Sequence, residues 1–242
     1  MSGRVLLQPA YLLSTRPYGD TSLLIEAFTP DHGRVGLVAR GARAPRAKLR
    51  GQLQAFTPLL LSWRLSGEVG TMTAAESCAP PVALRGERVF FGWYLNELIL
   101  RLLQRHDAHP SVYASYAELL PLLALSDAQA QAALRVFEKR LLADIGYGLM
   151  LGAELRSERR YRYDWDSGPI VVDDDDAPAY AGSHLIALRD ECLDHEAARR
   201  DARHLLQGAL RRQLGGRELR TPRLLRELRA GRPAPPGDVP AT

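Results

Sequence analysis

The chain is poor in cysteine and in long apolar runs. Cys78 and Cys192 are its only cysteines, and they stand far apart, outside any CxxC pattern. This spacing argues against a disulfide framework and against a cysteine zinc site, so we expect no metal and no cofactor. No stretch reaches the about 18 apolar residues of a membrane helix, and residues 1–9 do not resemble a signal peptide. We therefore expect a cytoplasmic protein without a membrane partner.

The motifs of nucleotide and metal chemistry are missing as well. The chain has no GxxxxGK[ST], no GxGxxG after a strand and no HExxH. Of the six histidines only His106 and His109 are close together, and Pro110 places them at a helix end, where they do not share a face. Ser22, Ser66, Ser77 and the two cysteines have no adjacent base to activate them. We expect no catalytic residues, and hence a protein that is not an enzyme.

Positive charge, in contrast, is concentrated in one stretch. No acidic residue lies between Arg34 and Gly67, so a basic loop between two strands can follow a phosphate backbone. We predict that DNA is bound by Arg34, Arg40, Arg43, Arg46, Lys48 and Arg50. A second basic stretch, residues 199–232, holds eleven arginines and three acids, 11 − 3 = +8, and is the alternative site.

The first eighty residues show the pattern of short strands. Strands are expected at residues 10–16, 22–28, 34–39, 53–63 and 69–76, with turns at 29–33 and 65–68. Five short strands with one basic loop favour a small closed barrel of the OB type over residues 1–79, because closure removes exposed edges. Tyr11, Phe56 and Trp63 could stack on bases or belong to the core.

The remainder of the chain is mostly helical in pattern. Helices are expected at residues 84–104, 110–125, 128–145 and 197–214, and the glycines of 146–148 suit a C-terminal cap. A last helix should start at Thr221, with Thr221 as N-cap and Pro222 at its first position. Asn96 and Glu97 are polar interruptions of an apolar helix, either at its boundary or bonded to a neighbour.

The predicted fold class is α+β. An OB barrel precedes an α-helical domain made of residues 82–149 and 183–230, with an irregular insertion at 150–182 and a disordered tail at 231–242. Acidic residues at 164, 166 and 173–176 could hold magnesium, but successive side chains of such a run point apart, which favours a solvated loop. A metal-dependent nuclease and an RNA-binding OB protein remain the alternatives.

Several motifs resemble the RecO family of bacterial recombination mediators. They are RPYGDTSLL at 16–24, FTPDHGRV at 28–35, VARGAR at 38–43, LRGQLQAFTPL at 49–59, WYLNEL at 93–98, FEKRLL at 137–142 and GYG at 146–148. The resemblance implies an N-terminal OB barrel, a helical domain and a non-enzymatic role in recombinational repair in the nucleoid. It implies binding of single- and double-stranded DNA, annealing of strands coated by single-stranded-DNA-binding protein, and loading of RecA with RecR. Many members carry four zinc-binding cysteines in the C-terminal part, which this chain lacks.

The resemblance also implies a partner site. The resemblance implies a partner, a single-stranded-DNA-binding protein, that ends in a short acidic tail with a terminal Phe. A receptor for such a tail needs an apolar slot beside a cation. Residues 134–141 offer both, because Arg135 and Lys139 are neighbours on one helix face while Phe137 and Leu141 form an apolar one. An ordinary amphipathic core helix with a solvated basic side is the alternative interpretation.

Overall fold

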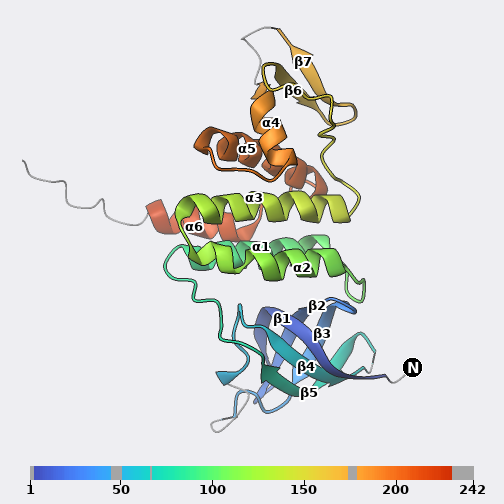
Figure 1. Ribbon diagram of the computed structural model, residues 1–242. Coiled ribbons are helices and arrows are strands. Elements are labelled where there is room, and N and C mark those ends of the chain that lie inside the picture. The colour runs from blue at the N-terminus through green and yellow to red at the C-terminus, as the bar shows by residue number, and fades with distance from the viewer. Residues whose placement is uncertain (1–2, 45–50, 66, 174–178, 231–242) are drawn as a thin grey trace, which may run out of the picture.

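The computed structural model describes residues 3–44, 51–65, 67–173 and 179–230 of the chain. The molecule is elongated: a β-barrel forms one end, layered helices form the middle, and a small β-sheet lies at the other end (Figure 1). No helix in the described ranges is long and apolar enough to cross a membrane.

The barrel contains β1 (Arg4–Tyr18), β2 (Ser22–Thr29), β3 (Gly33–Ala39), β4 (Leu59–Arg64) and β5 (Val69–Ser77). It closes in the order β1-β2-β3-β5-β4. The pair β3–β5 is parallel, and the other pairs are antiparallel. Fully buried Ile25, Leu37, Leu61 and Trp63 fill the interior. The predicted OB-type barrel is confirmed.

Strand β1 is longer than the pattern predicted because it serves two neighbours. Residues 4–10 pair with β4, and residues 11–18 pair with β2. The register shifts between Leu12 and Ser14, a bulge that bends the strand and helps to close the barrel.

The helical part contains α1 (Arg88–Leu102), α2 (Pro110–Leu119), α3 (Asp127–Asp144), α4 (Gly182–Arg189), α5 (Glu196–Gln213) and α6 (Arg220–Ala230). The expected helix at 110–125 is divided, because Pro121 starts a separate 3₁₀ turn. Helix α3 begins with a capping box between Ser126 and Gln129. It ends at Asp144 and is followed by Gly146, whose φ is +84°, while the Tyr147 amide donates to the Leu142 carbonyl. The predicted glycine cap is thus confirmed.

Helix α6 is capped from a distance. The backbone N–H groups of Arg220 and Thr221 each donate a 2.8 Å hydrogen bond to the Glu97 carboxylate in α1. The expectation of Thr221 as N-cap is therefore wrong, because the helix starts at Arg220, two residues before the predicted first position, and a distant acid accepts its free donors. Glu97 in this way joins the C-terminal helix to the middle of the molecule.

A small sheet occupies the stretch that showed no regular pattern in the sequence. It contains β6 (Arg160–Asp164), β7 (Gly168–Val172) and β8 (Tyr180–Ala181) in the order β7-β6-β8. Trp165, in the β6–β7 turn, packs against α5, where a Cβ on Gly208 would come within 2.9 Å of its ring. The Arg212 guanidinium lies 5.4 Å from the ring centre.

The barrel and the helices share a core and a charged clamp. Tyr11, Phe28 and Phe56 of the barrel side belong to the same buried cluster as the helices. The Glu26 carboxylate of β2 accepts hydrogen bonds from Arg105 and from Arg34. Strand β2 and the segment that follows α1, which are far apart in the sequence, are therefore held together at the rim of the barrel.

Candidate functional site

The outer face of the barrel sheet collects cations that have no acidic partner. Residues that pair across neighbouring strands lie on the same face of a sheet. One row of pairs crosses all five strands in the order β1, β2, β3, β5 and β4; its members are Arg16, Leu24, Val38, Thr71 and Arg64. In the described part of the chain, the Arg16 and Arg64 side chains form no ion pair or hydrogen bond, and both are exposed. This face therefore presents free positive charge.

The start of the basic loop lies at the end of this face. Arg40 is exposed directly after β3 and has no side-chain partner among the described residues. The Arg43 amide donates to the Thr21 carbonyl at 2.7 Å, and its guanidinium donates to the Gly19 carbonyl at 3.2 Å. These bonds fix the first part of the loop against the β1–β2 turn. The predicted contacts Arg46, Lys48 and Arg50 lie outside the described residues.

Arg34 has a different position from the one expected. Its guanidinium donates to the carbonyls of Leu100 and Leu103 at 2.8 and 2.6 Å and to Glu26 at 3.2 Å. Only 13% of its side chain is exposed. This side chain joins the barrel to the end of α1, and a contact of Arg34 with DNA stays a prediction.

A slot of about 440 Å³ opens on the same outer face. Its walls come from the β1–β2 turn, the end of β3 and the start of β5: Tyr18, Thr21, Ser22, Val38, Arg40, Gly41, Val69, Gly70 and Thr71. The aromatic residues considered for stacking are not there, because Tyr11, Phe56 and Trp63 are 7%, 6% and 0% exposed. Sequence reasoning missed Tyr18, although a large aromatic residue directly before a Gly-Asp turn could have signalled it.

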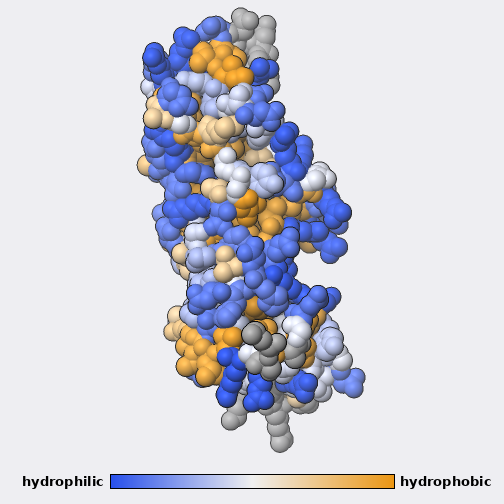
Figure 2. Space-filling model, turned by 90° about the vertical axis from the view of Figure 1, so that its right-hand side faces the viewer, coloured by the Kyte–Doolittle hydropathy of each residue, from blue (hydrophilic) through white to orange (hydrophobic). Residues whose placement is uncertain are grey.

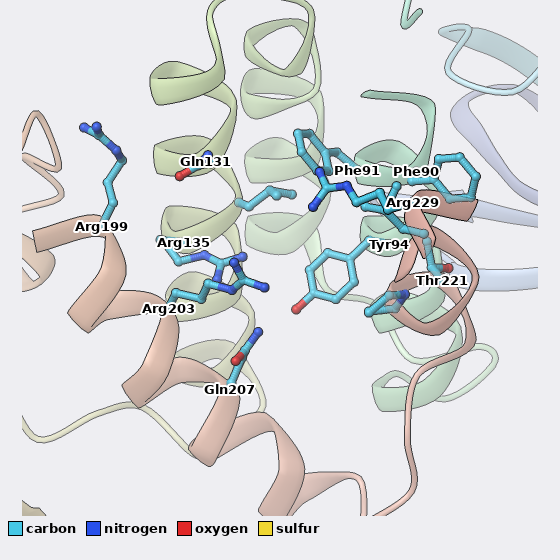
Figure 3. A pocket seen from close by; sticks show the side chains of 13 residues that line it. Phe90, Phe91, Tyr94, Gln131, Arg135, Arg199, Arg203, Gln207, Thr221 and Arg229 are labelled. Carbon is cyan, nitrogen blue, oxygen red and sulfur yellow. The ribbon is translucent and has the colours of Figure 1, made fainter. Parts of the chain in front are cut away.

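A second site lies among the helices, between α1, α3, α5 and α6 (Figure 3). This pocket has a volume of about 180 Å³. Its apolar walls are Phe90, Phe91, Tyr94, Leu134, Pro222 and Leu225, and its cations are Arg135, Arg199, Arg203 and Arg229. No acidic residue of the described chain lines it. We call it the arginine pocket.

A buried network lies behind the Tyr94 and Arg135 side of the arginine pocket. Tyr94 and Arg135 both donate to the Glu138 carboxylate, at 2.6 and 2.7 Å. Burial raises the pKa of Glu138, and the nearby Arg135, Tyr94 and Arg203 side chains offset part of this rise. Within the described chain, Nε and Nη1 of Arg135 are buried and have no hydrogen-bond partner.

Arg203 is the more accessible cation of this pocket. Figure 3 shows its guanidinium pointing into the same part of the pocket as that of Arg135, opposite the Tyr94 ring. Arg203 is exposed and makes no ion pair or hydrogen bond with another described residue. Arg229, in contrast, pairs with Glu87 at 2.5 Å. The combination of aromatic walls and the accessible Arg203 guanidinium suits an apolar group that carries a carboxylate.

The partner site expected on α3 is only partly retained. Phe137 and Leu141 are 0% exposed and belong to the core between the helices, as the alternative interpretation of an amphipathic core helix expects. The Lys139 ammonium donates to the Arg189 carbonyl and to Glu191 at 2.5 and 3.0 Å. Of the four expected residues, Arg135 alone lines the arginine pocket.

The acidic residues considered for magnesium have structural partners where they are described. Asp164 accepts hydrogen bonds from the backbone of Asp166 and Ser167, at 3.1 and 2.9 Å, and so closes the β6–β7 turn. Asp173 pairs with Arg159 at 3.4 Å, and residues 174–178 are not described. Among the described residues, no three His, Cys, Asp or Glu side chains are grouped so that they could hold a metal ion.

Much of the surface around these sites is hydrophilic. Figure 2 shows a predominantly hydrophilic face with a hydrophobic cluster on the barrel, in the lower part of the view. Leu6 and Leu7 of β1 are 57% and 53% exposed.

Comparison with known proteins gives matches over nearly the whole chain. Residues 1–81 match the family model described as Recombination protein O N terminal, and residues 84–223 match Recombination protein O C terminal. A DNA repair protein RecO from Methylococcus capsulatus is 43% identical over 229 residues, covering 92% of this chain and 94% of the relative. The protein of the same name from Nitrosococcus oceani is 43% identical over 234 residues, covering 93% and 95%. That from Dechloromonas aromatica is 40% identical over 237 residues, covering 94% and 98%.

Proposed function

The chain belongs to the RecO family of DNA repair proteins, and we propose that it is a recombination mediator without a catalytic centre. In this role it binds single- and double-stranded DNA, anneals complementary strands and helps to load RecA together with RecR. The observation that carries the proposal is the row of unpaired cations on the outer barrel face, which includes Arg16, Arg40 and Arg64.

Unpaired cations support annealing for an electrostatic reason. Two complementary strands repel each other through their phosphates, and each arginine that neutralises a phosphate also releases a counterion. A face without compensating carboxylates can do this without breaking internal ion pairs. Since phosphate contacts carry no sequence information, such a face suits strands of any sequence.

The arginine pocket supports a second part of the proposal, the binding of a single-stranded-DNA-binding protein through its acidic tail. A terminal Phe ring would lie against Phe90, Phe91 and Leu225, and its carboxylate would meet Arg135 and Arg203. The tail site is thus proposed between four helices rather than on α3 alone.

Strand annealing, measured with and without a coat of single-stranded-DNA-binding protein, tests the proposal. The double variant Arg40→Ala, Arg43→Ala should slow annealing of bare and coated strands alike. Arg203→Ala should slow annealing of coated strands and leave that of bare strands unchanged. Folded protein that anneals neither kind of strand would refute the mediator role, and magnesium-dependent strand cleavage would favour a nuclease.

Calorimetry with an acidic peptide ending in Phe tests the pocket directly. Loss of a carboxylate–guanidinium contact costs about 1.5–3 kcal/mol, so Arg203→Ala should weaken binding about tenfold or more. Arg200→Ala is the matched control, because Arg200 neighbours the site on α5 without lining the pocket. Lys139→Ala should bind as the wild type does. Equal binding by the Arg203 and Arg200 variants would place the tail elsewhere.

A further inference from the structure

Tyr18 is a large aromatic residue without an intramolecular role in the described structure. Its side chain is 54% exposed at the end of β1, paired with Ser22 of β2. Among the described residues it has no aromatic contact, and its hydroxyl makes no hydrogen bond. Exposed aromatic residues with a free face are a common feature of binding surfaces, since a ring that packs against nothing contributes little to folding.

The surroundings of Tyr18 suit a nucleobase. It shares the outer-face slot with Arg40, whose guanidinium has no described partner. The hydroxyls of Thr21, Ser22 and Thr71 line the same slot and can serve as donors or acceptors at a base edge. Because the slot lies between the β1–β2 turn and the start of β5, it occupies the region where OB barrels hold oligonucleotides.

We propose that this slot takes one unpaired nucleobase of single-stranded DNA, stacked on the Tyr18 ring, while Arg40 holds the adjacent phosphate. The proposal rests on the proposed function, in that it assumes DNA on the outer barrel face. It adds a residue that distinguishes a single strand from a duplex, which the cations alone do not do.

The discrimination follows from the availability of the base face. In a duplex each base is covered above and below by its neighbours, so stacking on Tyr18 would first require a base to be unpaired and unstacked, which disfavours binding. In a single strand the face is free, and stacking on an aromatic side chain is independent of sequence. Arginine contacts to phosphate are made in both cases.

The test compares Tyr18→Ala and Tyr18→Phe on three ligands: oligothymidine, a duplex of equal length, and a single strand whose central nucleotides are abasic. From typical stacking strengths, Tyr18→Ala should weaken binding to oligothymidine about fivefold or more, with less than a twofold change on the duplex. Tyr18→Phe should bind like the wild type. Wild-type protein should bind the abasic strand more weakly than oligothymidine, and Tyr18→Ala should not make this distinction.

Tyr147→Ala is the control, because Tyr147 is 56% exposed and lies beyond α3, outside the barrel. It should bind all three ligands as the wild type does. If Tyr18→Ala binds oligothymidine as tightly as the wild type, the stacking proposal is overturned while DNA binding by the barrel stands. If the wild type binds none of the ligands, the proposed function itself is overturned. Equal losses on single strand and duplex would also overturn the assignment of strand preference to Tyr18.

Discussion

The Tyr116 hydroxyl donates a 2.7 Å hydrogen bond to the side-chain oxygen of Asn96, and both residues are buried. The Asn96 amide nitrogen in turn donates to the Leu13 carbonyl at 3.0 Å. One side chain therefore connects α2, α1 and barrel strand β1. The polar interruption in an apolar helix is explained by this bonding to neighbours.

Replacement of Asn96 by Ala should destabilise the protein by at least about 2 kcal/mol, because it leaves the Tyr116 hydroxyl and a barrel carbonyl buried without partners. Tyr116→Phe removes only one of these bonds and should cost about 1 kcal/mol. Urea unfolding of both single variants and the double variant gives the coupling between the residues. Fully additive losses would contradict a shared network.

A methyl group at Gly33 should loosen the contact between the barrel and the helices. A Cβ there would overlap the Asp107 backbone, whereas one at Gly19 would meet no atom within 4 Å. Both glycines have φ of +58°, so Gly19→Ala reports the backbone penalty alone, about 1 kcal/mol. Gly33→Ala should cost clearly more in thermal unfolding. Equal losses would show that the close approach to Asp107 is unimportant.

Salt dependence should reveal the basic loop as a phosphate-binding element. With four to five phosphates contacted, the slope of log K against log salt on single strands should be roughly −3. The variant with Arg43, Arg46 and Lys48 changed to Ala should flatten this slope by about 2 units. An unchanged slope in folded protein would move the site, first of all to the arginines of 199–232. A charge-matched control is the triple Ala variant of Arg156, Arg159 and Arg162.

The buried Glu138 should make stability depend on pH in the acid range. Its pKa is raised in the folded state by burial, so the folded protein binds this proton more tightly than the unfolded chain does. Stability should therefore fall as pH rises from the pKa of Glu138 in the unfolded chain, about 4.3, through its raised pKa in the folded protein. Glu138→Gln lacks this titration and should gain stability relative to wild type over that interval. Parallel stability curves for the two proteins would contradict the raised pKa.

The β6–β7 hairpin should be held by packing and not by zinc. Metal analysis of purified protein should find no stoichiometric zinc, and a chelator should leave the thermal midpoint unchanged, because the two cysteines are isolated and exposed. Trp165→Ala, which removes the ring packed on Gly208, should lower the midpoint. One zinc per chain would overturn this interpretation.

Local signals in the sequence predicted the parts of the fold that depend on neighbouring residues. The glycine cap after α3 and the succession of five strands are of this kind. The cap of α6 could not be predicted, because the Glu97 acceptor is 123 residues away from Arg220. The same holds for Arg34, whose three acceptors come from two different elements. Nothing in the sequence around Phe137 distinguishes a side chain that packs in the core from one that lines a slot on the surface.

The clamp formed by Glu26, Arg34 and Arg105 joins the barrel to the end of α1, and the two parts also share a buried core. The barrel face and the arginine pocket are therefore two proposed binding sites on parts of the molecule that are packed together. A partner held by a flexible tail in the pocket would deliver its DNA to the barrel at a high local concentration, so that strand transfer becomes an intramolecular event. Under the proposed function, the length of the partner's tether, rather than any opening of this protein, would then decide which strands can be reached.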